Sequence, residues 1–110
     1  MTQLDCRLGY YGLMSFASYA HPIGTEENRE WIAVNVPDGY FLFSKPTVAA
    51  HPMVVRRRMQ VSGEHLEVVT EGCAFGNKGA YDAAMMELPP ALKTISKGGQ
   101  NVQLKAVLEQ

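Results

Sequence analysis

The sequence predicts an α+β domain, with a mostly antiparallel sheet of about six or seven strands joined in hairpins. Two segments, "WIAVNVPDGYFLFS" and "MVVRRRMQVSGEHLEVVTEG", predict the sheet because each reads as strand, short turn, strand. An Ala- and Met-rich segment before Pro89-Pro90 predicts one broken helix over about residues 80–97, packed on one face of the sheet before a final strand. A chain of 110 residues is expected to form a single compact domain, 1–110.

The N-terminal region alternates apolar with polar residues, so residues 4–10 and 13–20 are predicted to be strands. Gly9 and Gly12 suit a tight turn or bulge between these strands. The segment that follows, "HPIGTEEN", is predicted to be a polar loop.

The first hairpin signal has Pro-Asp-Gly between two apolar strands. A three-residue turn over 37–39 pairs Val36 with Tyr40 and Val34 with Leu42. In that register three aromatic residues share one face of the hairpin: Trp31, Phe41 and Phe43. Since both faces are largely apolar, we expect the hairpin to be central in the sheet or to meet a partner subunit.

The second hairpin turns at Gly63-Glu64, a two-residue loop of the type II′ kind. This loop places Arg57 opposite Thr70 and Arg56 opposite Glu71. Arg56 and Arg58, two positions apart on the same face, then lie beside carboxylates on a solvated face, which nearly cancels the local charge. Arg57 points to the otherwise apolar face, where it either lies at the rim or binds a carboxylate or phosphate.

The segment "GAYDAAMMEL" has helical composition, and Pro89-Pro90 ends it. Pro90 can begin a second short helix, "PALKTISK", which Gly98 would end in a left-handed conformation. The last strand is predicted in "NVQLKAVL", with alternate residues on one face: Val102, Leu104, Ala106 and Leu108.

A Gly-rich loop, residues 72–79, connects the second hairpin to the helix. Its backbone donors and helix dipole, with Gly76, Asn77 and Lys78, form a candidate anion site together with Arg57. The spacing of its glycines does not match the nucleotide-triphosphate loop, and a flexible connection into the helix is the simpler interpretation.

The two cysteines, Cys6 and Cys73, fit no metal-binding spacing, and no metal or cofactor is predicted. We expect both to be reduced thiols in a soluble, cytoplasmic protein, because no convincing export signal precedes them. Cys73 with His51 is the one dyad that a thiol enzyme could use. A small apolar thiol near the core is the alternative.

A net charge of −1 gives no global basic field, so neither nucleic acid nor membrane is an expected partner. The first hypothesis is a non-enzymatic binding or protein-interaction domain that self-associates, as a dimer, through Trp31, Phe41 and Phe43. The second is a binder of a small anionic ligand or nucleic acid, using Arg57, Lys78 and the Gly-rich loop. The third is a thiol enzyme centred on Cys73; no catalytic residue is assigned.

Three segments, "VPDGYFL", a later "GC" and "ALKTISKGGQNVQLKA", resemble the invasion-associated locus B family of bacterial exported proteins. The resemblance covers the second half of the chain. The paired cysteines and the signal peptide expected of that family are not recognisable in the sequence, and no function is carried over from it.

Overall fold

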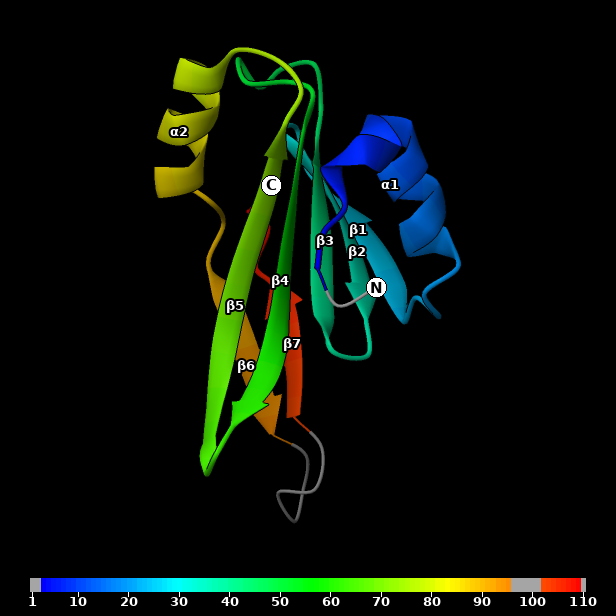
Figure 1. The fold of residues 1–110 in the computed structure, drawn as a ribbon, viewed down its shortest axis with the longest axis vertical. Coiled ribbons are helices and arrows are strands. Elements are labelled where there is room, and N and C mark those ends of the chain that lie inside the picture. The colour runs from blue at the N-terminus through cyan, green and yellow to red at the C-terminus, as the bar shows by residue number, and fades with distance from the viewer. Residues whose placement is uncertain (1–2, 96–101, 110) are drawn as a thin grey trace.

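The computed structural model describes residues 3–95 and 102–109 (Figure 1). Within them the chain forms a short 3-10 helix, two α-helices and seven strands, in the order η1 (Cys6–Leu8), α1 (Gly9–Ser18), β1 (Gly24–Glu27), β2 (Trp31–Val36), β3 (Gly39–Ser44), β4 (Met53–Ser62), β5 (His65–Ala74), α2 (Lys78–Met86), β6 (Ala91–Ile95) and β7 (Val102–Ala106). The predicted α+β class with hairpin-connected strands is confirmed.

Strands β1 to β5 form one antiparallel sheet in sequence order, and β6 pairs with β7 in a separate two-stranded sheet. Helix α1 covers one face of the large sheet, while α2 and the β6–β7 hairpin lie toward the other (Figure 1). The α1-side cluster of buried residues comprises Leu13, Ala17, Val36, Phe41, Phe43, Val54 and Cys73. The α2-side cluster comprises Trp31, Ala33, Tyr40, Leu42, Ala50, Met53, Val55, Leu104 and Ala106.

The two strands predicted near the N-terminus are wrong, since residues 9–18 form helix α1. Leu13 and Ala17 are fully buried, and Tyr10 and Met14 pack against the same cluster. These four positions have the i, i+3, i+4, i+7 spacing of one helix face, and that face packs on the sheet. The Tyr10 hydroxyl fixes the contact by donating a hydrogen bond to the Ser44 carbonyl oxygen at 2.6 Å.

The first hairpin forms, but its predicted register is off by one residue. Val36 lies opposite Gly39 rather than Tyr40, so the turn consists of the two residues Pro37 and Asp38. Gly39 belongs to the ladder because β4 passes close beside it: a Cβ at Gly39 would lie 2.0 Å from the Arg57 carbonyl oxygen. The shift moves every residue of β3 to the face opposite the predicted one.

The second hairpin has the predicted register, with Arg57 opposite Thr70 and Arg56 opposite Glu71. Gly63 has a φ of +63°, and Glu64 is not among the non-glycine residues with positive φ. This matches the type II′ turn, which needs a positive φ only at its first central residue.

The segment predicted to be a polar loop contains strand β1, which pairs with β2 at the edge of the large sheet. Edge strands can be short and polar, so "GTEE" lacks the alternation that reveals half-buried strands.

Only the first half of the predicted broken helix is helical. Helix α2 begins after Asn77, whose side-chain oxygen accepts the N–H of Ala80 at 2.8 Å. The predicted second helix is wrong: residues 91–95 form β6, and the predicted end at Gly98 lies outside the described residues. Pro90 instead receives a β-type hydrogen bond, from the Val107 N–H to its carbonyl oxygen at 2.9 Å. The last predicted strand is confirmed as β7.

Cys6 and Cys73 form a disulfide, so the prediction of reduced thiols is wrong. The bond joins η1 to β5 across 67 positions of sequence. Spacing rules recognise cysteines that are close in sequence, and no such rule pairs residues this far apart. Among the described residues, neither helix has the length and apolarity that crossing a membrane requires.

Candidate ligand-binding pocket

The residues of the Gly-rich loop that were predicted to hold an anion are engaged by the chain itself. Asn77 caps α2 with its side-chain oxygen. Lys78 is in a salt bridge with Asp82, and its ammonium lies 5.0 Å from the centre of the Tyr81 ring. Gly76 packs against the preceding loop so closely that a Cβ there would lie 2.8 Å from the His51 carbonyl oxygen.

Arg57 lies on the face that the sequence predicted, but its donors contact protein atoms. Its guanidinium donates to the Tyr40 hydroxyl at 2.9 Å, the Pro89 carbonyl oxygen at 2.8 Å and the Thr70 hydroxyl at 3.3 Å. Pro89 follows the C-terminus of α2, whereas Lys78 begins that helix. Nine helical residues span about 13 Å, so the structure does not bring the parts of the predicted anion site together.

The other two arginines of the cluster differ from each other. Arg58 forms the expected ion pair with Glu71 at 3.1 Å. Arg56 is only 7% exposed, in contrast to the predicted solvated position. Its guanidinium lies over the Phe41 ring, 5.3 Å from the ring centre, and 3.5 Å from an Asp38 carboxylate oxygen.

The three aromatic residues predicted to share an interface lie on opposite faces of the sheet. Trp31 is in the α2-side cluster, and Phe41 and Phe43 are in the α1-side cluster. Trp31 is 5% exposed and the two phenylalanines are fully buried, so all three pack within the core of a single chain.

Cys73 has no free thiol because it is bonded to Cys6, and this weighs against the thiol-enzyme hypothesis. The predicted partner His51 contacts Ser44 instead, with Nδ1 2.8 Å from the serine hydroxyl oxygen. That hydroxyl is fully buried and accepts the Met53 N–H at 2.8 Å, so it positions the loop before β4 rather than facing a substrate. Among the described residues, no group of three or more His, Cys, Asp or Glu side chains could hold a metal ion.

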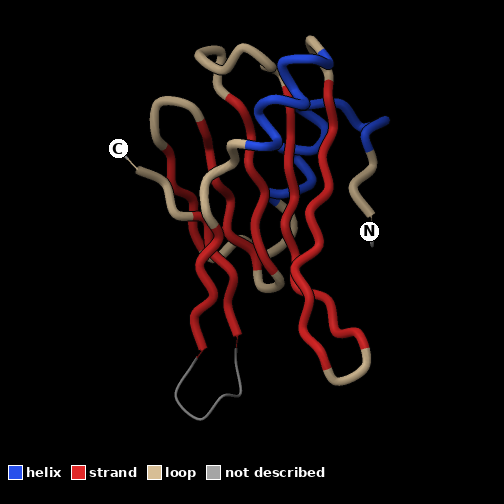
Figure 2. Tube along the Cα trace, turned by 90° about the vertical axis from the view of Figure 1, so that its left-hand side faces the viewer, coloured by secondary structure: helices blue, strands red, loops and turns tan. Residues whose placement is uncertain are grey.

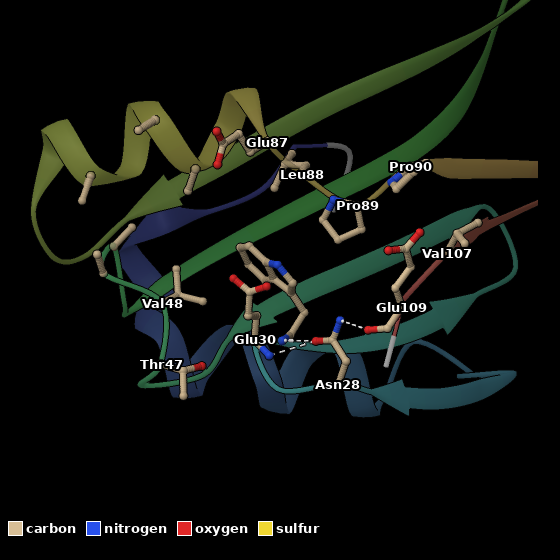
Figure 3. A pocket seen from close by; sticks show the side chains of 16 residues that line it. Asn28, Glu30, Thr47, Val48, Glu87, Leu88, Pro89, Pro90, Val107 and Glu109 are labelled. Carbon is tan, nitrogen blue, oxygen red and sulfur yellow. Dashed lines mark hydrogen bonds between the residues drawn. The ribbon is translucent and has the colours of Figure 1, made fainter.

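A pocket of about 520 Å³ lies between α2, the loop 45–52, the turn before β2 and the segment after β7 (Figure 3). Its apolar lining consists of aliphatic side chains, five of them alanine, and one indole: Trp31, Val48, Ala49, Ala50, Ala80, Ala83, Ala84, Leu88, Pro89, Pro90 and Val107. This volume is within the range of small-molecule sites in proteins.

The lower wall of the pocket is built by Asn28, which organises the turn before β2 (Figure 3). Its side-chain oxygen accepts the N–H groups of Glu30 at 2.9 Å and Trp31 at 2.8 Å. Its side-chain nitrogen donates to the Glu109 carbonyl oxygen at 3.0 Å. The Thr47 hydroxyl donates to the Arg29 carbonyl oxygen at 2.6 Å, which attaches the loop to this turn. The wall is therefore held by hydrogen bonds and is in place before a ligand arrives.

Three carboxylates line the pocket, those of Glu30, Glu87 and Glu109. None of the three is in a salt bridge with another described residue. Six other carboxylates are paired with cations: Asp5, Glu26, Glu27, Asp38, Glu71 and Asp82. Two more described carboxylates without a salt bridge, Glu64 and Glu67, lie in the β4–β5 hairpin, so three of the five gather at this pocket, called the acidic pocket below.

Sequence reasoning missed the acidic pocket, although part of its signal was present. Ala80, Ala83, Ala84 and Glu87 have helical spacing, so one face of α2 carries small residues and then a carboxylate. Small side chains leave room between a helix and its neighbours. The elements opposite that face are the loop 45–52 and residues 107–109, which were not predicted to lie there.

Comparison with protein-family models finds no match to this chain, and comparisons with curated proteins and with solved structures find none either.

Proposed function

We propose that the protein is a non-enzymatic binding domain whose ligand is a small organic cation with an apolar body, held in the acidic pocket. The supporting observation is the set of unpaired carboxylates, Glu30, Glu87 and Glu109, around an apolar lining. A ligand that buries apolar surface there also brings its charge into a pocket that these carboxylates line. A neutral apolar ligand would leave the carboxylates unpaired, and an anion would be repelled by them.

Two kinds of contact give such a ligand its affinity. Its apolar body removes alanine, valine and proline surface from water, at about 25 cal/mol per Å² buried. Its ammonium group interacts with the carboxylates, each contributing about 0.2–1 kcal/mol because they are exposed. A cation placed over the face of the Trp31 indole gains a further favourable interaction.

The test uses the chain's single tryptophan, Trp31, as a fluorescent reporter of binding. Benzylamine, benzyl alcohol and benzoate have similar shapes and carry positive, zero and negative charge. We expect benzylamine alone to change Trp31 emission saturably. Glu87→Gln should weaken that binding several-fold, and rising salt concentration should weaken it too.

Glu67→Gln is the matched control, because Glu67 is an exposed carboxylate on β5 that does not line the pocket. Benzylamine should bind this variant as it binds the unmodified protein. Equal binding of benzoate and benzylamine, or equal weakening in both variants, would contradict a cation site at this pocket.

We propose an oxidising compartment for the protein in place of the cytoplasm. The disulfide between Cys6 and Cys73 supports this, because disulfides persist where thiols are not kept reduced. Trapping thiols with an alkylating reagent in intact cells of the native source tests it. Modification of both cysteines under non-reducing conditions would restore the cytoplasmic prediction.

Self-association remains a prediction, and the structure offers a different surface for it. Beyond Arg58, β4 no longer pairs with β3, and β4 and β5 continue as a two-stranded arm. Val61, Leu66 and Val68 on one side of this arm are 72%, 41% and 38% exposed. Light scattering of the unmodified protein and of Val61→Glu tests whether the arm is the dimer surface. A dimer that is lost in Val61→Glu would support it, whereas a monomer in both proteins would contradict self-association.

The hypothesis of an anion or nucleic-acid binder also stays a prediction. The hydrogen bonds that Arg57 makes to Tyr40 and Pro89 weigh against it, because those donors would have to be released first.

A further inference from the structure

Strand β5 is the last strand of the large sheet, and among the described strands it pairs with β4 alone. In Figure 1 it runs in front of β4, and no described element crosses in front of its lower half. Figure 2 shows the β4–β5 hairpin at the lower right, separate from the β6–β7 hairpin that leads into the grey segment. The outer edge of a last strand is a row of N–H and C=O groups that can pair with another strand.

Two backbone hydrogen bonds show which residues of β5 face this edge. The Phe75 N–H donates to the Pro52 carbonyl oxygen at 3.0 Å, which continues the β4–β5 ladder by one pair. The Met59 N–H donates away from β5, to the Asp38 carbonyl oxygen at 2.9 Å. Bonded and non-bonded pairs alternate along an antiparallel ladder. Both bonds therefore direct the N–H and C=O groups of the even-numbered residues of β5 outward.

Three of these residues, Leu66, Val68 and Thr70, form the open part of the edge, which we call the β5 edge. All three are exposed, Leu66 and Val68 to 41% and 38%. The β5 edge ends before Gly72, because the Cys6 sulfur lies 3.8 Å from the Gly72 carbonyl oxygen. Strand β5 contains neither lysine nor proline, the residues that commonly keep edge strands from pairing.

Symmetric pairing of two β5 edges is restricted by charge and by space. In an antiparallel pair, outward-facing residues lie opposite each other, so the two-fold axis passes one of residues 66–70. An axis at residue 67 places Glu67 opposite its own copy, and an axis at residue 69 places it opposite Glu71. Like charges that face each other across strands are destabilising. An axis at residue 70 requires the covered Gly72, and an axis at residue 66 requires the turn 63–64.

The remaining register, with its axis at Val68, is complementary on both faces of the strand. On one face Val68 lies opposite Val68 of the second copy, and Leu66 lies opposite Thr70. On the other face His65 lies opposite Glu71, so that the imidazole ring can donate to the carboxylate.

We propose that the protein forms a two-fold dimer in which β5 pairs antiparallel with β5 of a second copy, with the axis at Val68. The proposal rests on the self-association predicted above and specifies its contact. The contact consists of backbone hydrogen bonds at the β5 edge, with Leu66, Val68 and Thr70 of each copy donating and accepting them. Packing between the exposed faces of two arms is the alternative contact.

The first test is amide hydrogen exchange at low and high concentrations of the full chain, with light scattering to report the dimer. We expect the amides of Leu66, Val68 and Thr70 to exchange roughly tenfold more slowly in the dimer. The amides of Glu67 and Val69, which face β4, should exchange at the same rate in both states. A dimer without this alternation overturns edge pairing alone, whereas a monomer at every concentration overturns self-association as well.

The second test is Val68→Pro, which removes an outward N–H and leaves the bonds to β4 in place. It should weaken the dimer roughly tenfold or more. Val61→Pro is the matched control, because the Val61 N–H faces the other edge of the arm, beyond the end of β3. This variant should dimerise like the unmodified protein. Equal weakening in both variants would assign the contact to the face of the arm and overturn the proposal.

A cysteine at the axis tests the register. In the proposed dimer the two copies of residue 68 have Cα atoms about 5.5 Å apart, within reach of a disulfide. The two copies of residue 70 are about 13 Å apart. Val68→Cys should therefore form a covalent dimer on air oxidation and Thr70→Cys should not. Equal cross-linking of the two variants would overturn this register.

Discussion

The Arg57 guanidinium in β4 donates a hydrogen bond of 2.8 Å to the carbonyl oxygen of Pro89, the third residue after α2. The same nitrogen donates to the fully buried Tyr40 at 2.9 Å. One side chain thus attaches the end of the helix to the centre of the sheet. These two hydrogen bonds explain why an arginine lies on an otherwise apolar face, and no ligand is needed to account for it.

Replacing Arg57 should therefore lower stability. Arg57→Met keeps most of the aliphatic length and removes the donors, and we expect the free energy of unfolding to fall by about 2–3 kcal/mol. Urea unfolding measures it. Arg7→Met is the control, because the Arg7 side chain is 91% exposed and the change should be within about 0.5 kcal/mol. Equal effects of the two substitutions would contradict a structural role for Arg57.

The close approach of β4 to Gly39 predicts a second outcome. Gly39→Ala places a methyl group against the Arg57 backbone, and separating the strands should cost about 2–3 kcal/mol. Gly24→Ala is a matched control at another strand residue, since no heavy atom lies within 4 Å of its added Cβ. Thermal unfolding of both variants measures the difference. A Gly39→Ala protein as stable as Gly24→Ala would mean that the two strands are not this close.

The disulfide should contribute strongly to stability. It closes a loop of 67 residues, which in the chain-entropy description stabilises the fold by about 4 kcal/mol. We expect the Cys6→Ser, Cys73→Ser double variant to unfold at much lower urea concentration, and reductant to bring the unmodified protein to the same midpoint. Reductant should not affect the double variant. Two titratable thiols in the purified native protein would contradict the pairing.

Stability should also fall at alkaline pH because of Tyr10. Burial, and then the neighbouring Tyr11, raise the pKa of Tyr10 above its ordinary value of 10.0. Because the pKa is raised in the folded state, this contribution is fully present below pH 10 and is lost as the pH rises through the folded pKa. The free energy of unfolding, measured across this pH range, should fall less for Tyr10→Phe than for the unmodified protein. Tyr11→Phe, at a residue 76% exposed, should keep the Tyr10 response. If the free energy of unfolding depended on pH identically in all three proteins, this role of Tyr10 would be contradicted.

The hairpins show what sequence reasoning could and could not predict. Gly63-Glu64 set the register of β4 with β5 correctly, because its two residues have one favoured turn geometry. Pro37-Asp38-Gly39 was placed one residue out, because the position of Gly39 depends on contact with β4 rather than on the turn. A local rule fails where a non-local contact decides the backbone.

The segments that were assigned wrongly carry two patterns at once. Residues 9–18 contain both an alternation and a helical spacing, and packing on Phe41 and Phe43 selects the helix. Residues 91–95 follow a proline that suits a helix start, but pairing with β7 selects a strand. The acidic pocket depends on a third unpredicted outcome, the placement of residues 107–109 opposite α2, so it could not be assembled from the sequence.

The disulfide between η1 and β5 also decides how the molecule responds to a protease. The connection from α1 to β1 includes Tyr19, 84% exposed, and Ile23, 58% exposed, so it is open to cleavage. A cut there separates the chain into two pieces that Cys6 and Cys73 still hold together. Electrophoresis would show one band without reductant and two fragments with it.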